Sequence, residues 1–312
     1  MTPPKTAILL LAHGTPDSPA DVPAYMRNIT GGRPIPEEVM REVQHRYELI
    51  GRSPLTDITL RQASALSELL KMPVYAGMRN WHPYIADVVK QMVADGITHA
   101  VALCLAPHNS RTSVGLYRTA LEKAATGLLQ VDLIDDWHDQ PLLITAFAMR
   151  LAAALPHDCI PVVFTAHSVP CRTICADASS AGDAYGSQVK QTATLVARAI
   201  ELRDGDWFFA YQSQGMSGGT WIGPTVEATL EALATSGHKR VLIQPIGFVC
   251  DHIEVLYDID IAFKEFAAQR GMQLTRAASL NDLPTFIAAI GATVRARLDA
   301  AGVRMNAPAQ AI

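Results

Sequence analysis

The sequence predicts an α/β protein composed of two similar halves, each a parallel sheet flanked by helices, with a cleft between them. The first observation is a repeated ending: ILLLAHGTP and VVFTAHSVP each carry a short apolar run into Ala-His, a small residue and a proline. Both runs are too short to form a helix of ordinary length, so each predicts a buried strand that ends in a loop at His13 or His167. The second observation is the alternation of strand-like and helix-like segments, which is typical of parallel sheets with helices on both faces.

Two further landmarks repeat in the same order along the chain. VYAGMRNWHP follows the first histidine and WFFAYQSQGMSGGTWIGP follows the second, and both are β-rich and end near Trp and Pro. Tyr117 then lies 21 positions after Gly96, and Tyr257 lies 20 positions after Gly237. Three paired landmarks favour a duplicated unit. The alternative, that any α/β chain repeats strand, loop and helix at similar spacing, stays open.

Short apolar runs bounded by Gly, Pro or polar residues predict eight strands. In order, they cover Ala7–Ala12, Val74–Met78, Ala100–Leu105, Val131–Asp135, Val162–Ala166, Trp207–Tyr211, Val241–Ile246 and Gln273–Arg276. The segments between them have the apolar spacing of helices. These cover Glu37–Ile50, Ile58–Leu70, Tyr84–Asp95, Gly115–Ala125, Leu142–Leu155, Ser187–Glu201, Thr225–Ser236, His252–Gln269 and Leu283–Ala300.

The boundary between the halves is expected near residue 155, which gives a first half of residues 1–155 and a second of residues 156–302. Residues 303–312 show no periodicity and predict a flexible tail. In open α/β sheets, ligands bind beyond the carboxyl ends of the strands, so both His13 and His167 are expected to face the cleft.

The composition excludes several classes of protein. A net charge of -4 over 312 residues gives no electrostatic reason to expect a nucleic-acid partner. The apolar run at Ala7–Ala12 is too short for a signal peptide or a transmembrane span, so we expect a cytoplasmic chain. Five cysteines, an odd number, fit a reducing compartment. Cys159, Cys171 and Cys175 fall short of the four thiolates that a [2Fe-2S] cluster usually takes, so such a cluster is not expected, nor is any tightly bound cofactor.

The segment QPIGFVCDHIEVLYDIDI carries the densest chemistry. Glu254 and Asp258 are four residues apart and share a helical face. Asp251 fits an N-cap, and His252 fits a structural residue at the helix entry better than a ligand. An acid near two histidines needs a cation or proton to offset its desolvation. Histidine and carboxylate ligands favour a borderline divalent metal. We expect this metal to bind transiently rather than in a structural site, because HExxH and paired CxxC motifs are both absent from the sequence.

Taken together, AHGTP, RYELIGRSPL, LAPHNSRTSVGLY, FTAHSVP, YQSQG, WIGP and PIGFVCDHIEVLYDID resemble the ferrochelatases, which insert Fe(II) into a porphyrin. The resemblance implies two Rossmann-like halves with the porphyrin between them, and a role in haem biosynthesis with release of two protons. It assigns the catalytic and metal-handling roles to His167 and Glu254. The length and the lack of a cysteine-bearing extension look most like the coproporphyrin III ferrochelatases, with protoporphyrin IX as the alternative substrate and a monomer as the expected state.

The same resemblance implies a substrate-binding set in the first half. It comprises His13, Thr30, Arg46, Tyr47, Ser53 and Tyr117. Arginine suits a propionate because its planar fork matches a carboxylate. Three positions depart from the family pattern: Thr30 where relatives carry an arginine, His13 where they carry a tyrosine, and Ala262 where an acidic series continues.

The chemistry of the reaction supports these roles. An imidazole can accept a pyrrole proton near neutrality, so we assign His167 as the base, Glu254 as its partner and Asp258 as a relay for a proton or metal. His13 resembles the metal-binding histidine of the small cobalt and sirohydrochlorin chelatases. A cobalt, nickel or sirohydrochlorin chelatase and a porphyrin carrier therefore stay as alternatives. A hydrolase using Ser168 is weaker, because no GxSxG motif is present.

Overall fold

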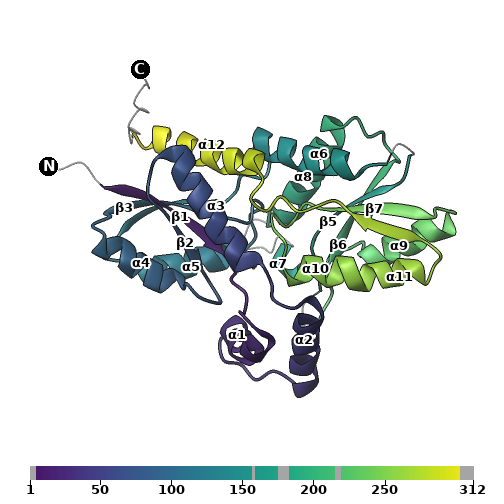
Figure 1. Cartoon of the computed structure of the whole chain (residues 1–312), viewed down its shortest axis with the longest axis horizontal. Helices are drawn as coiled ribbons and strands as arrows, with labels where there is room; N and C mark the ends of the chain where they lie inside the picture. The colour runs from purple at the N-terminus through teal and green to yellow at the C-terminus, as the bar shows by residue number, and fades with distance from the viewer. Residues whose placement is uncertain (1–4, 157–158, 175–182, 215–218, 303–312) are drawn as a thin grey trace.

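The computed structural model describes residues 5–156, 159–174, 183–214 and 219–302. It contains two four-stranded parallel sheets, and Figure 1 shows them side by side. The first consists of β1 (Thr6–Ala12), β2 (Val74–Met78), β3 (His99–Cys104) and β4 (Gln130–Ile134), in the order β2-β1-β3-β4. The second consists of β5 (Val162–His167), β6 (Trp207–Gln212), β7 (Arg240–Pro245) and β8 (Gln273–Arg276), in the order β6-β5-β7-β8. The identical order confirms the predicted pair of similar α/β halves.

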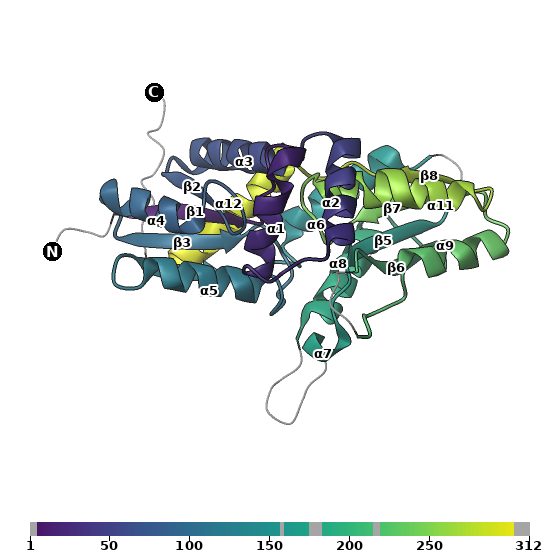
Figure 2. The same cartoon turned by 90° about the horizontal axis from the view of Figure 1, so that it is seen from below.

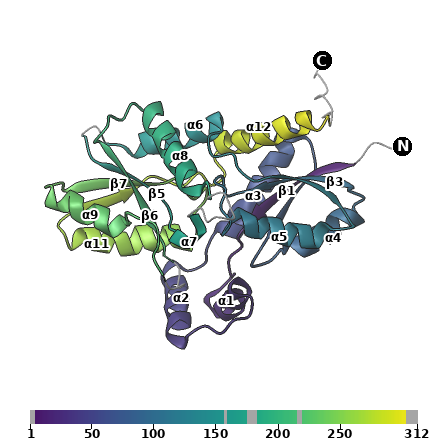
Figure 3. The same cartoon turned by 180° about the vertical axis from the view of Figure 1, so that it is seen from behind.

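Helices cover both faces of each sheet because the strands are apolar on both faces. In β1, Leu9 and Leu11 pack with α4 (Ile85–Ala94) and α5 (Val114–Ala125), whereas Ile8 and Leu10 pack with α3 (Leu55–Leu70) and α12 (Pro284–Ala300). The second sheet packs α9 (Val226–Thr235) and α11 (Lys264–Ala268) on one face, and α6 (Pro141–Ala154) and α8 (Tyr185–Ala199) on the other. Figure 3 shows α6, α8 and α12 along one side of the molecule.

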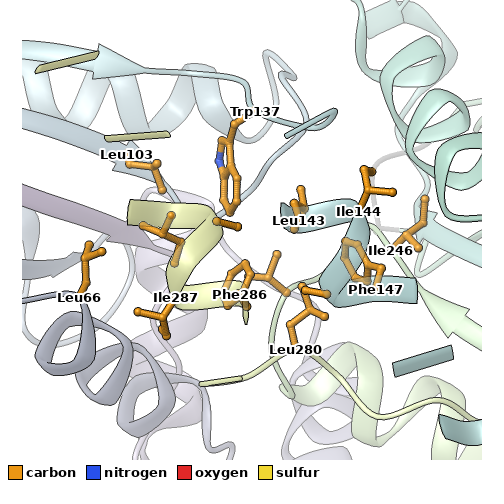
Figure 4. Close-up of a cluster of buried hydrophobic side chains, with 14 of the residues drawn as sticks. Leu66, Leu103, Trp137, Leu143, Ile144, Phe147, Ile246, Leu280, Phe286 and Ile287 are labelled. Carbon is orange, nitrogen blue, oxygen red and sulfur yellow. The ribbon is translucent and has the colours of Figure 1, made fainter. Parts of the chain in front are cut away.

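The last helix crosses back to the first half. α12 packs against α3, β3 and α6, although the expected boundary assigns residues 156–302 to the second half. Its apolar side chains belong to a core that also contains Ile8, Leu103 and Phe164, from both sheets. Figure 4 shows part of this shared core. The two halves therefore share one hydrophobic cluster, although each also has a cluster of its own on the other face of its sheet. Residues 303–312, the expected tail, lie outside the described residues.

Three segments were not predicted by the sequence pattern. A short 3-10 turn (Pro19–Asp21) and α1 (Val22–Thr30) precede α2 (Glu37–Ile50), and α7 (Cys171–Ile174) follows β5. Figure 2 shows α1 and α2 across the middle of the molecule. The helix predicted over His252–Gln269 is divided into α10 (Ile253–Leu256), a π-helix η2 (Asp258–Phe263) and α11. Asp258 and Asp260, the acids that follow Glu254, therefore lie in the π-helix.

Candidate active site

Both histidines stand where the sequence predicts, at the carboxyl ends of equivalent strands. His13 directly follows β1 and His167 ends β5. Gly14 adopts a positive φ of +78°, and a Cβ there would lie 2.8 Å from Met78 Cβ and 2.9 Å from the Trp81 backbone nitrogen. Only glycine fits this turn without displacing the backbone. The tight turn therefore fixes the position of His13.

Glu254 lies between two histidines of the second half. Its Oε1 is 3.3 Å from His167 Nε2, and its Oε2 is 3.8 Å from His252 Nε2. The other ring nitrogen of His167, Nδ1, donates to the carbonyl oxygen of Ser168. Gln212, paired with His167 in the β5–β6 ladder, donates from Nε2 to the Glu254 carbonyl oxygen at 2.7 Å. His252, expected to be structural, thus contacts the acid directly.

The His167–Glu254 pair is charged in this site. Burial lowers the pKa of His167, but the Glu254 charge and hydrogen bond outweigh burial and raise that pKa to about 8. Burial raises the pKa of Glu254, and the charge and hydrogen bond of His167 reverse this and lower it to about 2. The pKa of His252 is lowered, chiefly by burial. At neutral pH the site therefore holds an imidazolium beside a carboxylate, and His167 must lose its proton before it can act as a base.

Asp258 is a second acid of the site, and it is more deeply buried than Glu254. Ser213 Oγ donates to its Oδ2, and Arg46 Nη1 lies 3.6 Å from its Oδ1. Burial and the Glu254 charge raise the pKa of Asp258 to about 6, against the opposing effects of Ser213 and Arg46. Its carboxyl group can therefore exchange a proton near neutral pH, as its assignment as a relay requires.

His13 is neutral, in contrast to His167. Burial and then the positive charge of Arg79 lower the pKa of His13 to about 3, and Glu254, His252 and His167 also act on it. The Asn80 amide nitrogen lies 3.0 Å from His13 Nε2 and 3.3 Å from Nδ1. The Tyr25 ring contacts the imidazole edge-on, with ring centroids 6.1 Å apart. A neutral imidazole has one nitrogen lone pair, which can accept from the Asn80 amide and suits a ligand better than an acid.

The remaining first-half residues of the predicted set differ in their surroundings. The hydroxyl groups of Tyr47 and Ser53 are buried, and neither has a hydrogen-bond partner within the described part of the chain. Tyr117 is buried beneath the Arg79 guanidinium, 5.5 Å from its ring centroid. Arg46 pairs with Glu42 and lies over the Tyr257 ring. Thr30 donates to the Arg33 carbonyl oxygen at 3.0 Å, so its hydroxyl stabilises a turn.

The sequence reasoning missed Arg79, Asn80, Gln212 and Ser213. All four follow or end strands β2 and β6, the neighbours of the strands that carry the histidines. The rule that placed His13 and His167 at strand ends therefore also applies to them. Arg79 has a buried Nε without a partner and forms no ion pair with any described residue.

Among the described residues, no group of three or more His, Cys, Asp or Glu side chains is arranged to hold a metal ion. Cys104, Cys159, Cys171 and Cys250 are free thiols, and Cys175 lies outside the described residues. In the same part of the chain, no helix is long and apolar enough to cross a membrane.

The comparisons with known proteins decide the family. A family model described as ferrochelatase matches residues 5–298. The chain belongs to the ferrochelatase family. It is 54% identical over 310 residues to a ferrochelatase of Acidobacterium capsulatum, which covers 95% of both chains. It is 33% identical over 313 residues to a coproporphyrin III ferrochelatase of Halalkalibacterium halodurans, covering 96% of this chain and 99% of the relative.

A solved structure supports the fold. SirB from Bacillus subtilis with Fe3+ superposes with a TM-score of 0.58 over 97% of this chain and 100% of that chain, at 12% identity. That similarity confirms the chelatase-like architecture of two parallel sheets. As a ferrochelatase, the chain is a lyase-class metal chelatase of haem biosynthesis whose substrates are a porphyrin and iron.

Proposed function

We propose that this ferrochelatase inserts Fe(II) into coproporphyrin III, with His167 as the base for the pyrrole protons and Glu254 as the group that receives the metal or a released proton. The observation that carries the proposal is the 3.3 Å contact between His167 Nε2 and Glu254 Oε1, at the carboxyl end of β5. His13, from the other half, lies close enough for the charges of both residues to act on it. Such a site supplies nitrogen and oxygen ligands suited to Fe(II).

The charges of His167 and Glu254 suggest an order of events. Fe(II) at Glu254 would offset the carboxylate charge that raises the pKa of His167, and the imidazolium would then release its proton. The neutral imidazole can accept the two pyrrole protons one after the other, and Asp258, whose pKa is about 6, can relay each of them away from the site. Porphyrin and Fe(II) thus give metalloporphyrin and two protons, and no oxidant or reductant is needed.

Cationic groups favour a substrate rich in carboxylates. Coproporphyrin III carries four propionates, whereas protoporphyrin IX carries two. Arg79 is partly buried beside Tyr117, and its charge lowers the pKa of His13. It lacks a carboxylate partner among the described residues. A propionate would satisfy its guanidinium in a bidentate contact. The similarity to a coproporphyrin III ferrochelatase over nearly the whole chain supports the same choice.

We expect anaerobic mixing with Fe(II) to metallate coproporphyrin III faster than protoporphyrin IX, with sirohydrochlorin unreactive, as followed by absorbance. Arg79→Ala should raise KM for coproporphyrin III by about 10- to 100-fold, because a charge-assisted hydrogen bond contributes about 1.5–3 kcal/mol. Arg203→Ala, which removes an exposed arginine paired with Asp206, is the matched control and should leave KM unchanged.

Three results would count against this proposal. Faster metallation of protoporphyrin IX would reverse the substrate assignment. Exclusive use of sirohydrochlorin would favour a different class of chelatase. Metallation at the background rate with every macrocycle, despite tight binding, would make the protein a carrier.

The pH dependence of the rate provides a separate prediction. His167 carries a raised pKa of about 8, so the neutral base predominates only above that pH. We expect kcat/KM for Fe(II) to rise with pH through about 8, since kcat/KM for the metal reports the enzyme before Fe(II) binds. Glu254→Gln removes the charge that contributes most to raising the pKa of His167. The pH midpoint of the variant's residual activity should therefore move to lower pH. Kinetics from about pH 6 to pH 9 measure both midpoints.

Glu231→Gln, which neutralises an exposed carboxylate on α9, is the matched control and should retain the original midpoint. An unchanged midpoint in Glu254→Gln would show that the acid does not set the protonation of the base.

A further inference from the structure

We infer that Arg276 is a positioning residue for metal insertion, because it holds both ends of residues 251–260, the segment that carries Glu254 and Asp258. The inference rests on the proposed function, in which Glu254 acts with His167. Arg276 touches none of the predicted catalytic residues in the described contacts, and its effect would pass through the segment that it holds.

The ion pairs of Arg276 join the two ends of this segment. Its Nη1 lies 3.2 Å from Asp251 Oδ1, at one end. At the other end, its Nη2 lies 2.7 Å from Asp260 Oδ2, and its Nε lies 3.1 and 3.0 Å from the two carboxylate oxygens of Asp260. The Arg276 side chain is only 12% exposed, and these contacts lower the pKa of Asp260 despite its burial. One rigid guanidinium thus bridges residues nine positions apart in the sequence.

Asp251 is fixed by two further side chains. Ser279 Oγ donates to Asp251 Oδ1 at 2.7 Å, and Asn281 Nδ2 donates to Asp251 Oδ2 at 2.8 Å. The Asp251 backbone N–H in turn donates to Asn281 Oδ1 at 2.9 Å. Asp251 is therefore not the N-cap that the sequence suggests, since its carboxylate is bound by the loop after β8. Gln62 of α3 donates to the Asn281 carbonyl oxygen at 2.7 Å, which connects this loop to the first half.

The segment has little internal structure to hold Glu254 in place. α10 contains four residues and is followed, after Tyr257, by the π-helix, and neither is long enough to be stable by itself. The 3.3 Å contact of Glu254 with His167 is sensitive to small shifts. A misplacement of about 1 Å can lower a catalytic rate by about 100-fold. Contacts at both ends of the segment are a direct way to prevent such a shift.

The ion pairs are better explained by orientation than by stability. A buried arginine between two carboxylates loses most of its Coulombic gain to desolvation, so an apolar set of similar volume would stabilise the fold equally well. A purely structural arginine would affect stability alone. A positioning arginine would affect kcat more than substrate affinity.

The test uses Arg276→Gln in the full chain. We expect kcat for Fe(II) insertion into coproporphyrin III to fall by about 10- to 100-fold, as is typical when a group that supports a metal-handling residue is lost. KM for the porphyrin should stay within about twofold, because the substrate-binding residues belong to the first half. Arg276→Lys should recover part of kcat, since an ammonium can pair with one end of the segment. Arg270→Gln is the matched control, because it breaks an ion pair with Glu231 in the same half and should leave kcat unchanged.

A double-mutant cycle separates this inference from the proposed function. If Arg276 acts through Glu254, adding Arg276→Gln to Glu254→Gln should lower the rate no further. An equal loss in both backgrounds, or an unchanged kcat in the single variant, would overturn the inference and leave the role of Glu254 intact. Full activity of Glu254→Gln alone would instead refute the proposed function. Circular dichroism checks the fold, and if Arg276→Gln does not fold, Asp260→Asn enters the same cycle with the same expectations.

Discussion

Replacing His167 by alanine is expected to abolish metal insertion while leaving porphyrin binding largely intact. The substitution removes the imidazole that lies 3.3 Å from Glu254, and a positioned general base contributes about 10²- to 10⁴-fold to a rate. It also leaves the Glu254 carboxylate without the cation that offsets its burial, so the pKa of Glu254 should rise. Single-turnover absorbance under anaerobic conditions measures insertion, and quenching of porphyrin fluorescence measures binding.

His45→Ala serves as the control for this variant, because His45 is an exposed histidine of α2 that pairs with Glu48. It should metallate and bind porphyrin normally. Normal turnover of His167→Ala would place the base elsewhere, and the mechanism given above would be wrong. Equal losses of binding and turnover would instead make His167 a porphyrin ligand without a base function.

The strands and the two histidine positions could be predicted from the sequence because they depend on local pattern. β1 is apolar on both faces, since Ile8 and Leu10 face α3 and α12 while Leu9 and Leu11 face α4 and α5. Such a strand has a continuous apolar run and a sharp end, and His13 is the first polar side chain after it. The same logic placed His167 at the end of β5.

The π-helix had a signal that the prediction overlooked. Val255, Ile259, Phe263 and Ala267 are buried at a constant spacing of four. In an α-helix of 3.6 residues per turn, that spacing drifts by about 40° at each step, so the four side chains would not stay on one face. A wider π turn resets the register. The uniform spacing could therefore have predicted η2.

The contacts that fix Glu254 and Asp258 could not be predicted in this way. Arg276, Ser213 and Arg46 reach this segment from β8, the end of β6 and α2, far away in the sequence. The raised pKa of His167 likewise depends on its distance from Glu254. Local pattern carries no information on such distances, so the sequence suggested a neutral base at pH 7 where the contact with Glu254 favours an imidazolium.

The return of α12 to the first half makes Phe286 a central residue of the shared core. Its side chain is fully buried and stacks on Trp137, with ring centroids 5.9 Å apart and an interplanar angle of 26°. Figure 4 shows Phe286 between Trp137 and Leu280, close to Phe147 of α6. We expect Phe286→Ala to lower the free energy of unfolding by about 3–5 kcal/mol, the usual cost of such a cavity. Differential scanning calorimetry should show a melting temperature lower by about 5–10 °C.

The cluster that both halves share also predicts the shape of this transition. Because Phe286 packs in a cluster that contains Leu103 of β3 and Phe164 of β5, its loss should destabilise both halves together and leave one cooperative transition. Asp299→Ala, at an exposed position of α12, is the control and should melt like the unmodified chain. Two separated transitions in Phe286→Ala, with only one displaced, would show instead that the halves unfold as independent domains and that α12 stabilises one of them alone.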